Sequence, residues 1–294
     1  MSGVAMDSAQ VIEEHERSGR YFTVGGRVES FVLDYGSGEP VVCLHGVPAS
    51  SFLYRKVIRE LAGRGLRGFA FDLPGLGLAA RPVDFDYTWT SLGRFALAAV
   101  DELGLDRFHL VVHDIGGPVG FEVAAAVPER VKSLTVLNSP VEVDRFRRPW
   151  VMEPFAHRGV GRIYLRLLKK PVFRWLMGYQ GVADRSKITN AEVDAYLDLL
   201  RRDDGGRAFL KIMRGFELTR AKRDLYVGVL RSMRYPVRIV WGEADPALKV
   251  TVRGEQARKA AGLDTIHRLP GKHFLQEDQA PALADEILAA TRSQ

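Results

Sequence analysis

One acidic residue of this chain stands where a buried strand turns sharply into a helix. The apolar run 110–113 leads directly to Asp114, and Gly116 and Gly117 follow before a helical pattern begins. A corner of this kind pushes one side chain out at the top of a sheet, where it serves as a nucleophile. A carboxylate in that place attacks an sp3 carbon and becomes an alkyl ester. Asp114 is therefore the predicted nucleophile, and epoxides and alkyl halides are the substrates that it suits.

Two further chemical side chains follow later strands of the same pattern. Asp245 comes after the strand expected at 237–241, and His273 comes after the last strand, expected at 265–269. The order nucleophile, acid, histidine predicts a triad in which Asp245 orients His273 and His273 activates water to hydrolyse the ester. Glu142, which follows the strand expected at 134–137, is a lower-ranked candidate for the acid.

Backbone donors are expected beside the nucleophile. The N–H groups of Val47, which follows a strand at 41–44, and of Ile115 would form an oxyanion hole. His45 and His113 are interpreted as hydrogen-bonded structural residues. The segment 72–77 lacks the spacing of a phosphate-binding loop and is interpreted as a tight turn. No cluster has the spacing of zinc ligands, so neither a metal nor a cofactor is expected.

Strands and helices alternate along most of the chain, which predicts an α/β fold with a mostly parallel sheet and helices on both faces. The eight expected strands cover residues 21–24, 28–35, 41–44, 68–73, 108–113, 134–137, 237–241 and 265–269. The expected helices of this pattern cover residues 52–61, 89–103, 119–126 and 281–290.

The alternation stops between residues 140 and 235, where the sequence is helical throughout. This segment is predicted to be a helical cap over the carboxyl ends of the strands, inserted between two parts of the core at 20–139 and 236–294. Its aromatic residues are expected to form most of the apolar pocket wall. The candidates are Phe146, Trp150, Phe155, Trp175 and Phe209.

Composition narrows the class of protein. The 294 residues are 46% hydrophobic and 27% charged, which suits one large α/β domain with an inserted module. No apolar run approaches the ~20 residues of a membrane span, so no membrane association is expected. The first twenty residues are interpreted as a start or short tail. The lone Cys43 is expected to be a buried thiol in a cytoplasmic protein, a monomer or a homodimer.

The formal charge is +6, and much of the excess lies between residues 145 and 174. A basic run can bind nucleic acid, but no nucleic-acid motif accompanies this one. It is interpreted as a solvated face, and no nucleic-acid partner is expected.

Residues 20–290 resemble the α/β-hydrolase family, in the branch of haloalkane dehalogenases and epoxide hydrolases that has an aspartate nucleophile. The resemblance rests on the motifs at 45–48, 54–56, 72–77, 113–117 and 272–277. It implies an α/β-hydrolase fold with an inserted cap. It also implies a small apolar or aromatic substrate.

Two departures from the family favour epoxide opening over dehalogenation. Haloalkane dehalogenases usually hold the halide with a Trp after the nucleophile and an Asn after the His-Gly pair, where this chain has Ile115 and Val47. Fluoroacetate dehalogenases favour an Arg at position 115. Trp150 or Trp175 could still supply a halide donor, so haloalkane dehalogenase remains the alternative. Another hydrolase activity is a further alternative, as is a silent binding protein, although the complete triad argues against the latter.

Epoxide hydrolases usually protonate the opening oxygen with two cap tyrosines. The resemblance makes Tyr179 and Tyr164 the first candidates here and Tyr196 the third. The position of the usual second tyrosine corresponds to Met213 in this chain, which weakens that expectation.

Overall fold

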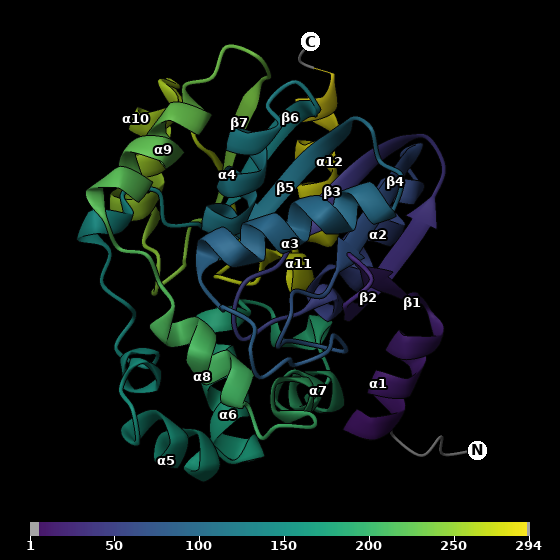
Figure 1. Ribbon diagram of the computed structural model, residues 1–294, viewed down its shortest axis with the longest axis vertical. Coiled ribbons are helices and arrows are strands. Elements are labelled where there is room, and N and C mark those ends of the chain that lie inside the picture. Colours follow the sequence, from purple (N-terminus) through teal and green to yellow (C-terminus); the bar gives the residue numbers. More distant parts are fainter. Residues whose placement is uncertain (1–5, 293–294) are drawn as a thin grey trace.

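The computed structural model describes residues 6–292 of the chain (Figure 1). The first five residues of the expected tail and the last two residues of the second core part lie outside the described residues.

The molecule is built on a single sheet of eight strands in the order β1-β2-β4-β3-β5-β6-β7-β8. The strands are β1 (Arg20–Val24), β2 (Val28–Gly36), β3 (Glu39–Leu44), β4 (Leu66–Phe71), β5 (Phe108–His113), β6 (Val131–Leu137), β7 (Val237–Gly242) and β8 (His267–Leu269). β2 is antiparallel to β1 and β4, and all other pairs are parallel. The predicted mostly parallel, eight-stranded α/β fold is therefore confirmed.

Helices cover both faces of the sheet (Figure 1). They are α2 (Arg55–Ala62), α3 (Trp89–Glu102), α4 (Gly116–Ala126), α9 (Arg220–Leu230), α10 (Glu255–Ala261), α11 (Leu275–Asp278) and α12 (Ala280–Thr291), with short turns η1 (Ser51–Tyr54) and η6 (Val250–Gly254). α3, α4 and α9 pack on one another on one face, and α2 packs on α12 on the other. No helix within residues 6–292 is long and apolar enough to cross a membrane.

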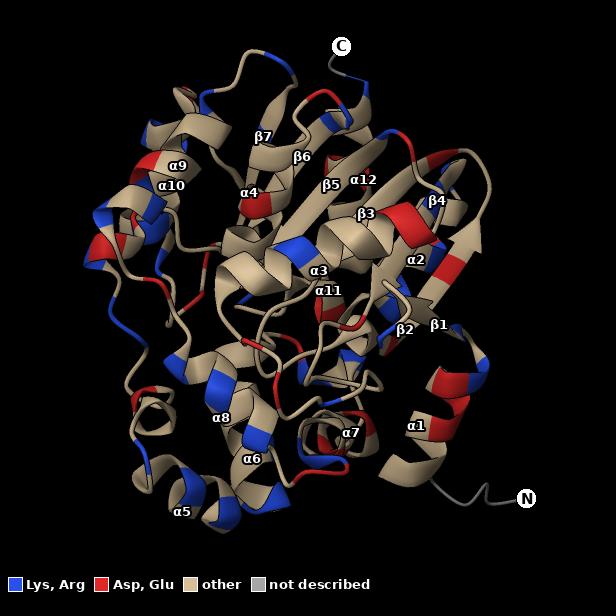
Figure 2. Cartoon of the chain, viewed as in Figure 1, with Lys and Arg blue, Asp and Glu red and all other residues tan. Residues whose placement is uncertain are grey.

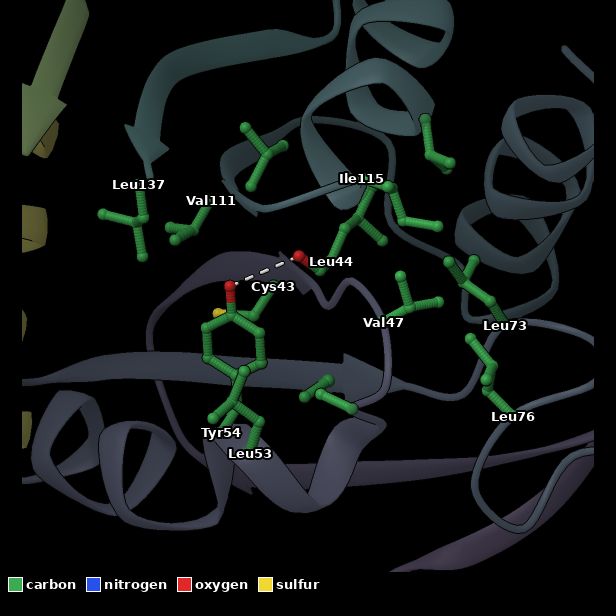
Figure 3. Close-up of a cluster of buried hydrophobic side chains, with 14 of the residues drawn as sticks. Cys43, Leu44, Val47, Leu53, Tyr54, Leu73, Leu76, Val111, Ile115 and Leu137 are labelled. Carbon is green, nitrogen blue, oxygen red and sulfur yellow. Dashed lines mark hydrogen bonds between the residues drawn. The ribbon is translucent and has the colours of Figure 1, made fainter. Parts of the chain in front are cut away.

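The inner strands are buried on both faces, so they are mostly apolar rather than strictly alternating. Side chains at the carboxyl ends of β3 and β5 and in the loops beyond them form a dry cluster (Figure 3). Val47 and Ile115, the two expected backbone donors, belong to this cluster. The hydroxyl of Tyr54 donates to the carbonyl of Leu44 at 3.3 Å across it. The loops that carry the site are thus held by packed side chains as well as by strand ends.

Between β6 and β7 the described residues form helices and turns only. These elements are η2 (Val143–Arg145), η3 (Glu153–Ala156), α5 (Val160–Leu167), α6 (Lys170–Leu176), η4 (Met177–Gly181), η5 (Arg185–Lys187), α7 (Asn190–Arg201), α8 (Arg207–Arg214) and α9. α5 to α8 gather below the sheet in Figure 1. α9 instead packs on α4 and α10, beside the core. The predicted cap boundary at residue 235 thus takes in one helix of the core layer, and the division into domains remains a prediction.

The first element of the described residues is a helix that the sequence interpretation missed. α1 (Ser8–Arg17) starts at a capping box between Asp7 and Gln10, where the sequence was expected to form a tail. His15 of α1 is buried against Phe31 and Phe52. The helix also packs on α7. The sequence signal is weak because only one narrow stripe of this acidic helix is apolar (Figure 2).

A buried ionic cluster joins the helix after β8 to α2 and to α7. The side chain of Glu277 on α11 is inaccessible to solvent and accepts from Arg55 Nη1 at 2.5 Å and from Lys56 Nζ at 2.8 Å. The hydroxyl of Tyr196 on α7 donates to the same carboxylate. Arg55 also pairs with the more accessible Glu192 of α7 at 2.6 Å. The cluster ties the segment below the sheet to the loop that carries His273.

Replacement of Glu277 by Gln should destabilise the fold strongly, because Arg55 and Lys56 would lose their buried counter-charge. Loss of one partner from a buried pair costs about 3 kcal/mol or more. Glu192→Gln removes a more exposed partner of the same arginine and should cost roughly 1 kcal/mol. Urea unfolding of both variants measures the difference. Equal costs would show that the buried carboxylate has no special role in stability.

Candidate active site

Asp114 occupies a tight backbone turn between β5 and α4. Its φ angle is +55°, in the left-handed region that residues with side chains rarely adopt. Neighbouring glycines leave room for this turn. A Cβ on Gly46 would lie 2.3 Å from Asp114 Oδ1, and one on Gly116 would lie 2.4 Å from the Leu44 carbonyl oxygen. The expected strand–turn–helix corner is present, and it directs the carboxylate away from the sheet.

The carboxylate of Asp114 is held in its ionised form. Oδ1 accepts a hydrogen bond from the backbone N–H of Val47 at 2.9 Å. Burial alone would raise the pKa of Asp114, but His273, His113 and the backbone N–H of Ile115 outweigh burial and hold the pKa below its usual value. Both expected backbone donors therefore act on this carboxylate, and Oδ2 lies 3.6 Å from His273 Nε2.

His273 lies between two carboxylates. Its Nδ1 is 2.8 Å from Asp245 Oδ2, and its Nε2 is 3.6 Å from Asp114 Oδ2. Burial lowers the pKa of His273, but Asp245 and Asp114 more than offset this and raise the pKa to about 10. The resting site thus contains an imidazolium between two carboxylate anions. The three residues expected from strand ends are brought together, in the order that the triad prediction requires.

Asp245 is fixed by a residue that the sequence interpretation did not single out. Asn138 follows β6 with a φ of +36° and donates from Nδ2 to Asp245 Oδ2 at 2.6 Å. The other oxygen of Asp245 accepts from the backbone N–H groups of Ala247 and Leu248. Within residues 6–292 no other acid than Asp114 and Asp245 pairs with His273, so the structure gives Glu142 no place in the triad.

The two histidines expected to be structural have such contacts. His45 donates from Nδ1 to the Gly46 carbonyl and accepts at Nε2 from the Leu73 N–H. His113 donates from Nε2 to the carbonyl of His273 at 2.8 Å. Burial and the nearby His273 lower the pKa of His113 to about 3, so it is neutral. His113 therefore supports the His273 loop without competing for its proton.

A cavity of about 100 Å³ lies over Asp114 and His273, and most of its lining comes from the helical segment below the sheet. Phe146, Phe155 and Phe209 line it, as expected. Trp150 and Trp175 do not, because their side chains are 66% and 60% exposed at the surface. The wall is mainly apolar and the space is small, which favours compact apolar substrates.

The three candidate tyrosines lie in different surroundings. Tyr164 lines the cavity beside Phe155, and its hydroxyl forms no hydrogen bond among the described residues. Tyr179 instead stacks on Trp175 at the surface, and the hydroxyl of Tyr196 is bound to Glu277. Neither of these two lines the cavity, so the structure corrects both expectations. Tyr179 lies on an exposed face of its segment, and Tyr196 is directed toward the buried carboxylate of Glu277, so neither phenol reaches the cavity.

The remaining lining residues include few polar side chains. Met213 lines the wall, so the cavity has a thioether at the position that corresponds to the second tyrosine of epoxide hydrolases. None of the lining residues is a tryptophan, and Arg148 and Gln180 supply side-chain N–H groups. Among residues 6–292, no group of three or more His, Cys, Asp or Glu side chains is placed to hold a metal ion.

The loop that carries His273 is bonded to the segment below the sheet. The N–H of His273 donates to the carbonyl of Gln180, and the N–H of Phe274 donates to that of Gly181. Lys272 donates from Nζ to the carbonyl of Gly178 at 2.6 Å. These bonds connect η4 directly to the base of the triad.

Comparisons with known proteins agree with this geometry. The family described as the alpha/beta hydrolase fold matches residues 39–159. A haloalkane dehalogenase of Mycobacterium marinum is 30% identical over 86% of this chain and 84% of its own length. The crystal structure of Cfl2 from Burkholderia cenocepacia has 26% identity and a TM-score of 0.81, covering 93% of this chain and 95% of that one. An epoxide hydrolase from Vigna radiata shares the fold at 21% identity and a TM-score of 0.75, with 92% and 96% coverage.

The protonated state of His273 has a consequence for stability. Because folding raises its pKa from 6.5 to about 10, the folded protein holds this proton more tightly than the unfolded chain does. The resulting stabilisation is complete below pH 6.5 and is lost as pH rises through 10. We expect the free energy of unfolding of wild type, relative to His273→Gln, to fall steadily across that range in urea titrations. A constant difference would mean that His273 is neutral in the resting protein.

Proposed function

This chain belongs to the α/β-hydrolase superfamily, in its branch with an aspartate nucleophile, and we propose that it hydrolyses small epoxides through an alkyl ester on Asp114. The observation that carries the proposal is the cavity lining. The lining that includes Asp114 offers one phenol without a hydrogen bond in the described structure, that of Tyr164, and no indole N–H. An epoxide needs a proton for the opening oxygen, whereas a halide needs a polarised N–H donor.

The first step would be attack by Asp114. Oδ1 accepts from the Val47 N–H, so Oδ2 is the oxygen that would attack an epoxide carbon and break its C–O bond. The hydroxyl of Tyr164 would give its proton to the departing oxygen. Esterification removes one of the two negative charges that raise the pKa of His273, so the imidazolium would return a proton to the Tyr164 phenolate. His273 is then neutral and able to act as a base.

The second step would be hydrolysis of the ester. Neutral His273 takes a proton from water, and the hydroxide adds to Cγ of Asp114. Negative charge then builds up on Oδ1, which the Val47 N–H stabilises, and the Ile115 N–H would be the second donor of the oxyanion hole. Collapse of the tetrahedral intermediate expels the alkoxide, which takes the proton from His273 and leaves as the diol. The acid proton of Asp114 then passes to His273 and restores the resting ion pair.

Haloalkane dehalogenation is the second candidate, and the relative from Mycobacterium marinum supports it. Dehalogenation and epoxide hydrolysis would pass through the same kind of alkyl ester and differ only in the leaving group. A halide would have to use the side-chain N–H donors of the lining, among which Gln180 is uncharged and unengaged in the described structure. Parallel assays of styrene oxide, epoxybutane and bromobutane separate the two activities.

The alkyl ester should be trapped when hydrolysis is blocked. His273→Gln removes the base, so incubation with an epoxide should raise the intact mass by the mass of one substrate molecule. Asp114→Ala should show neither turnover nor adduct, and the Asp114→Ala/His273→Gln double variant should remain unmodified. Normal turnover by folded Asp114→Ala would overturn the covalent mechanism.

Tyr164→Phe should lower the rate of epoxide opening by roughly 10²–10⁴-fold, the usual worth of a general acid. Tyr179→Phe is the matched control, because it removes a phenol from the exposed face of the same segment. Initial rates with styrene oxide measure both variants. If Tyr164→Phe turns over epoxides at the wild-type rate, another group protonates the oxygen and the proposed role is wrong.

A further inference from the structure

One arginine of the basic run at 145–174 departs from the solvated face expected for that run. Most of these residues are exposed, and Figure 2 shows basic residues along α5 and α6. Arg148 instead lines the cavity over Asp114. Only three lining residues carry an ionisable charge, namely Asp114, His273 and Arg148. The first two belong to the proposed triad, and Arg148 has no part in it.

Arg148 is the half-buried cation of this run that lacks a carboxylate. Lys170 pairs with Asp198 at 2.7 Å, and Arg174 pairs with Asp194 at 2.6 Å. Among residues 6–292, no acidic side chain lies within ion-pair distance of Arg148. The difference is local, because all three side chains come from the same segment of the chain.

The guanidinium of Arg148 is also poorly supplied with hydrogen-bond acceptors. Nη2 donates to the carbonyl of Met213 at 2.8 Å, and the group lies 4.5 Å from the centre of the Phe216 ring. Nε is inaccessible to solvent and has no acceptor within the described part of the chain. Burial lowers the pKa of Arg148, and the charge of Glu153, which lies beyond ion-pair distance, offsets this only in part. An arginine side chain remains cationic in a protein, and a desolvated cation without a direct ion-pair partner is costly to maintain.

We propose that Arg148 binds a carboxylate of the substrate, at the end away from the carbon that Asp114 attacks. The guanidinium is a planar fork of N–H donors that suits a carboxylate better than any neutral group. Asp114 and Arg148 line the same cavity of about 100 Å³, so the proposed substrate would contact both. The substrate class is therefore short-chain acids that carry an epoxide. This inference rests on the proposed function only for the identity of the reactive group.

Electrostatics gives Arg148 a role in selectivity. A carboxylate that enters this cavity is repelled by Asp114, which must be ionised to attack. Arg148 offsets that repulsion, and the effect is large because the cavity wall is mainly apolar. Without Arg148 the same cavity should prefer neutral compounds.

The first test measures binding without catalysis. Hexanoate and hexanol are matched in length, and neither can alkylate Asp114. Isothermal titration calorimetry should show hexanoate binding at least tenfold more tightly than hexanol to wild type, with the preference lost in Arg148→Met. The control is Arg147→Met, which removes the same charge from an exposed neighbour outside the cavity lining and should keep the preference. Equal affinity of the two compounds for wild type would overturn the inference.

The second test uses reactive compounds. For epoxybutanoate against epoxybutane, the ratio of kcat/KM should fall at least tenfold in Arg148→Met and partly recover in Arg148→Lys. An equal loss for both compounds would mean that Arg148 only holds the cavity wall together, and the inference would fall. Arg148→Gln can still donate to Met213, and it replaces Arg148→Met if that variant does not fold. A carboxylate preference in calorimetry without epoxide turnover would refute the proposed function and leave this inference standing.

Discussion

Asp114 keeps a left-handed backbone because the loops around it leave no room for another path. The Leu44 carbonyl presses against Gly116 on one side, and Gly46 lies directly against the carboxylate on the other. A turn this tight costs free energy, and the packing of the buried cluster at β3 and β5 offsets that cost. The side chain gains a single orientation, with one oxygen on the Val47 N–H and the other toward His273. Every distance in the site follows from that orientation.

The charge arrangement builds on this geometry. Two carboxylates near one imidazole favour its protonated form, and Asn138 with the Ala247 and Leu248 N–H groups satisfies Asp245 so that it remains an anion. The site therefore stores a proton before the substrate arrives. Esterification of Asp114 cancels one of the two negative charges, so the same reaction that needs a proton also makes it available. No group has to move for this change in acidity.

The sequence was informative where chemistry coincided with strand ends. Asp114, Asp245 and His273 could be located because each follows an apolar strand, and parallel strands bring such residues to one edge. Their catalytic roles remain predictions. Asn138 was missed because its importance is a contact with Asp245, over a hundred residues away, and α1 was missed because its apolar stripe is short.

The direction of each side chain within the helical segment could not be predicted from the sequence. Tyr164, Tyr179 and Tyr196 have similar surroundings in the chain, yet one lines the cavity, one lies at the surface and one binds Glu277. Trp175 on α6 and Trp150 in the turn before η3 also lie at the surface, and the sequence of neither segment shows which neighbour it meets. The hydrogen bonds that join η4 to the His273 loop also limit how substrate can enter the cavity. η4 cannot move away from the sheet without displacing His273, and Glu277 holds α7 through Tyr196. α5 has most of its contacts with η3 and α8, so a movement that admits substrate has to leave the η4 side in place.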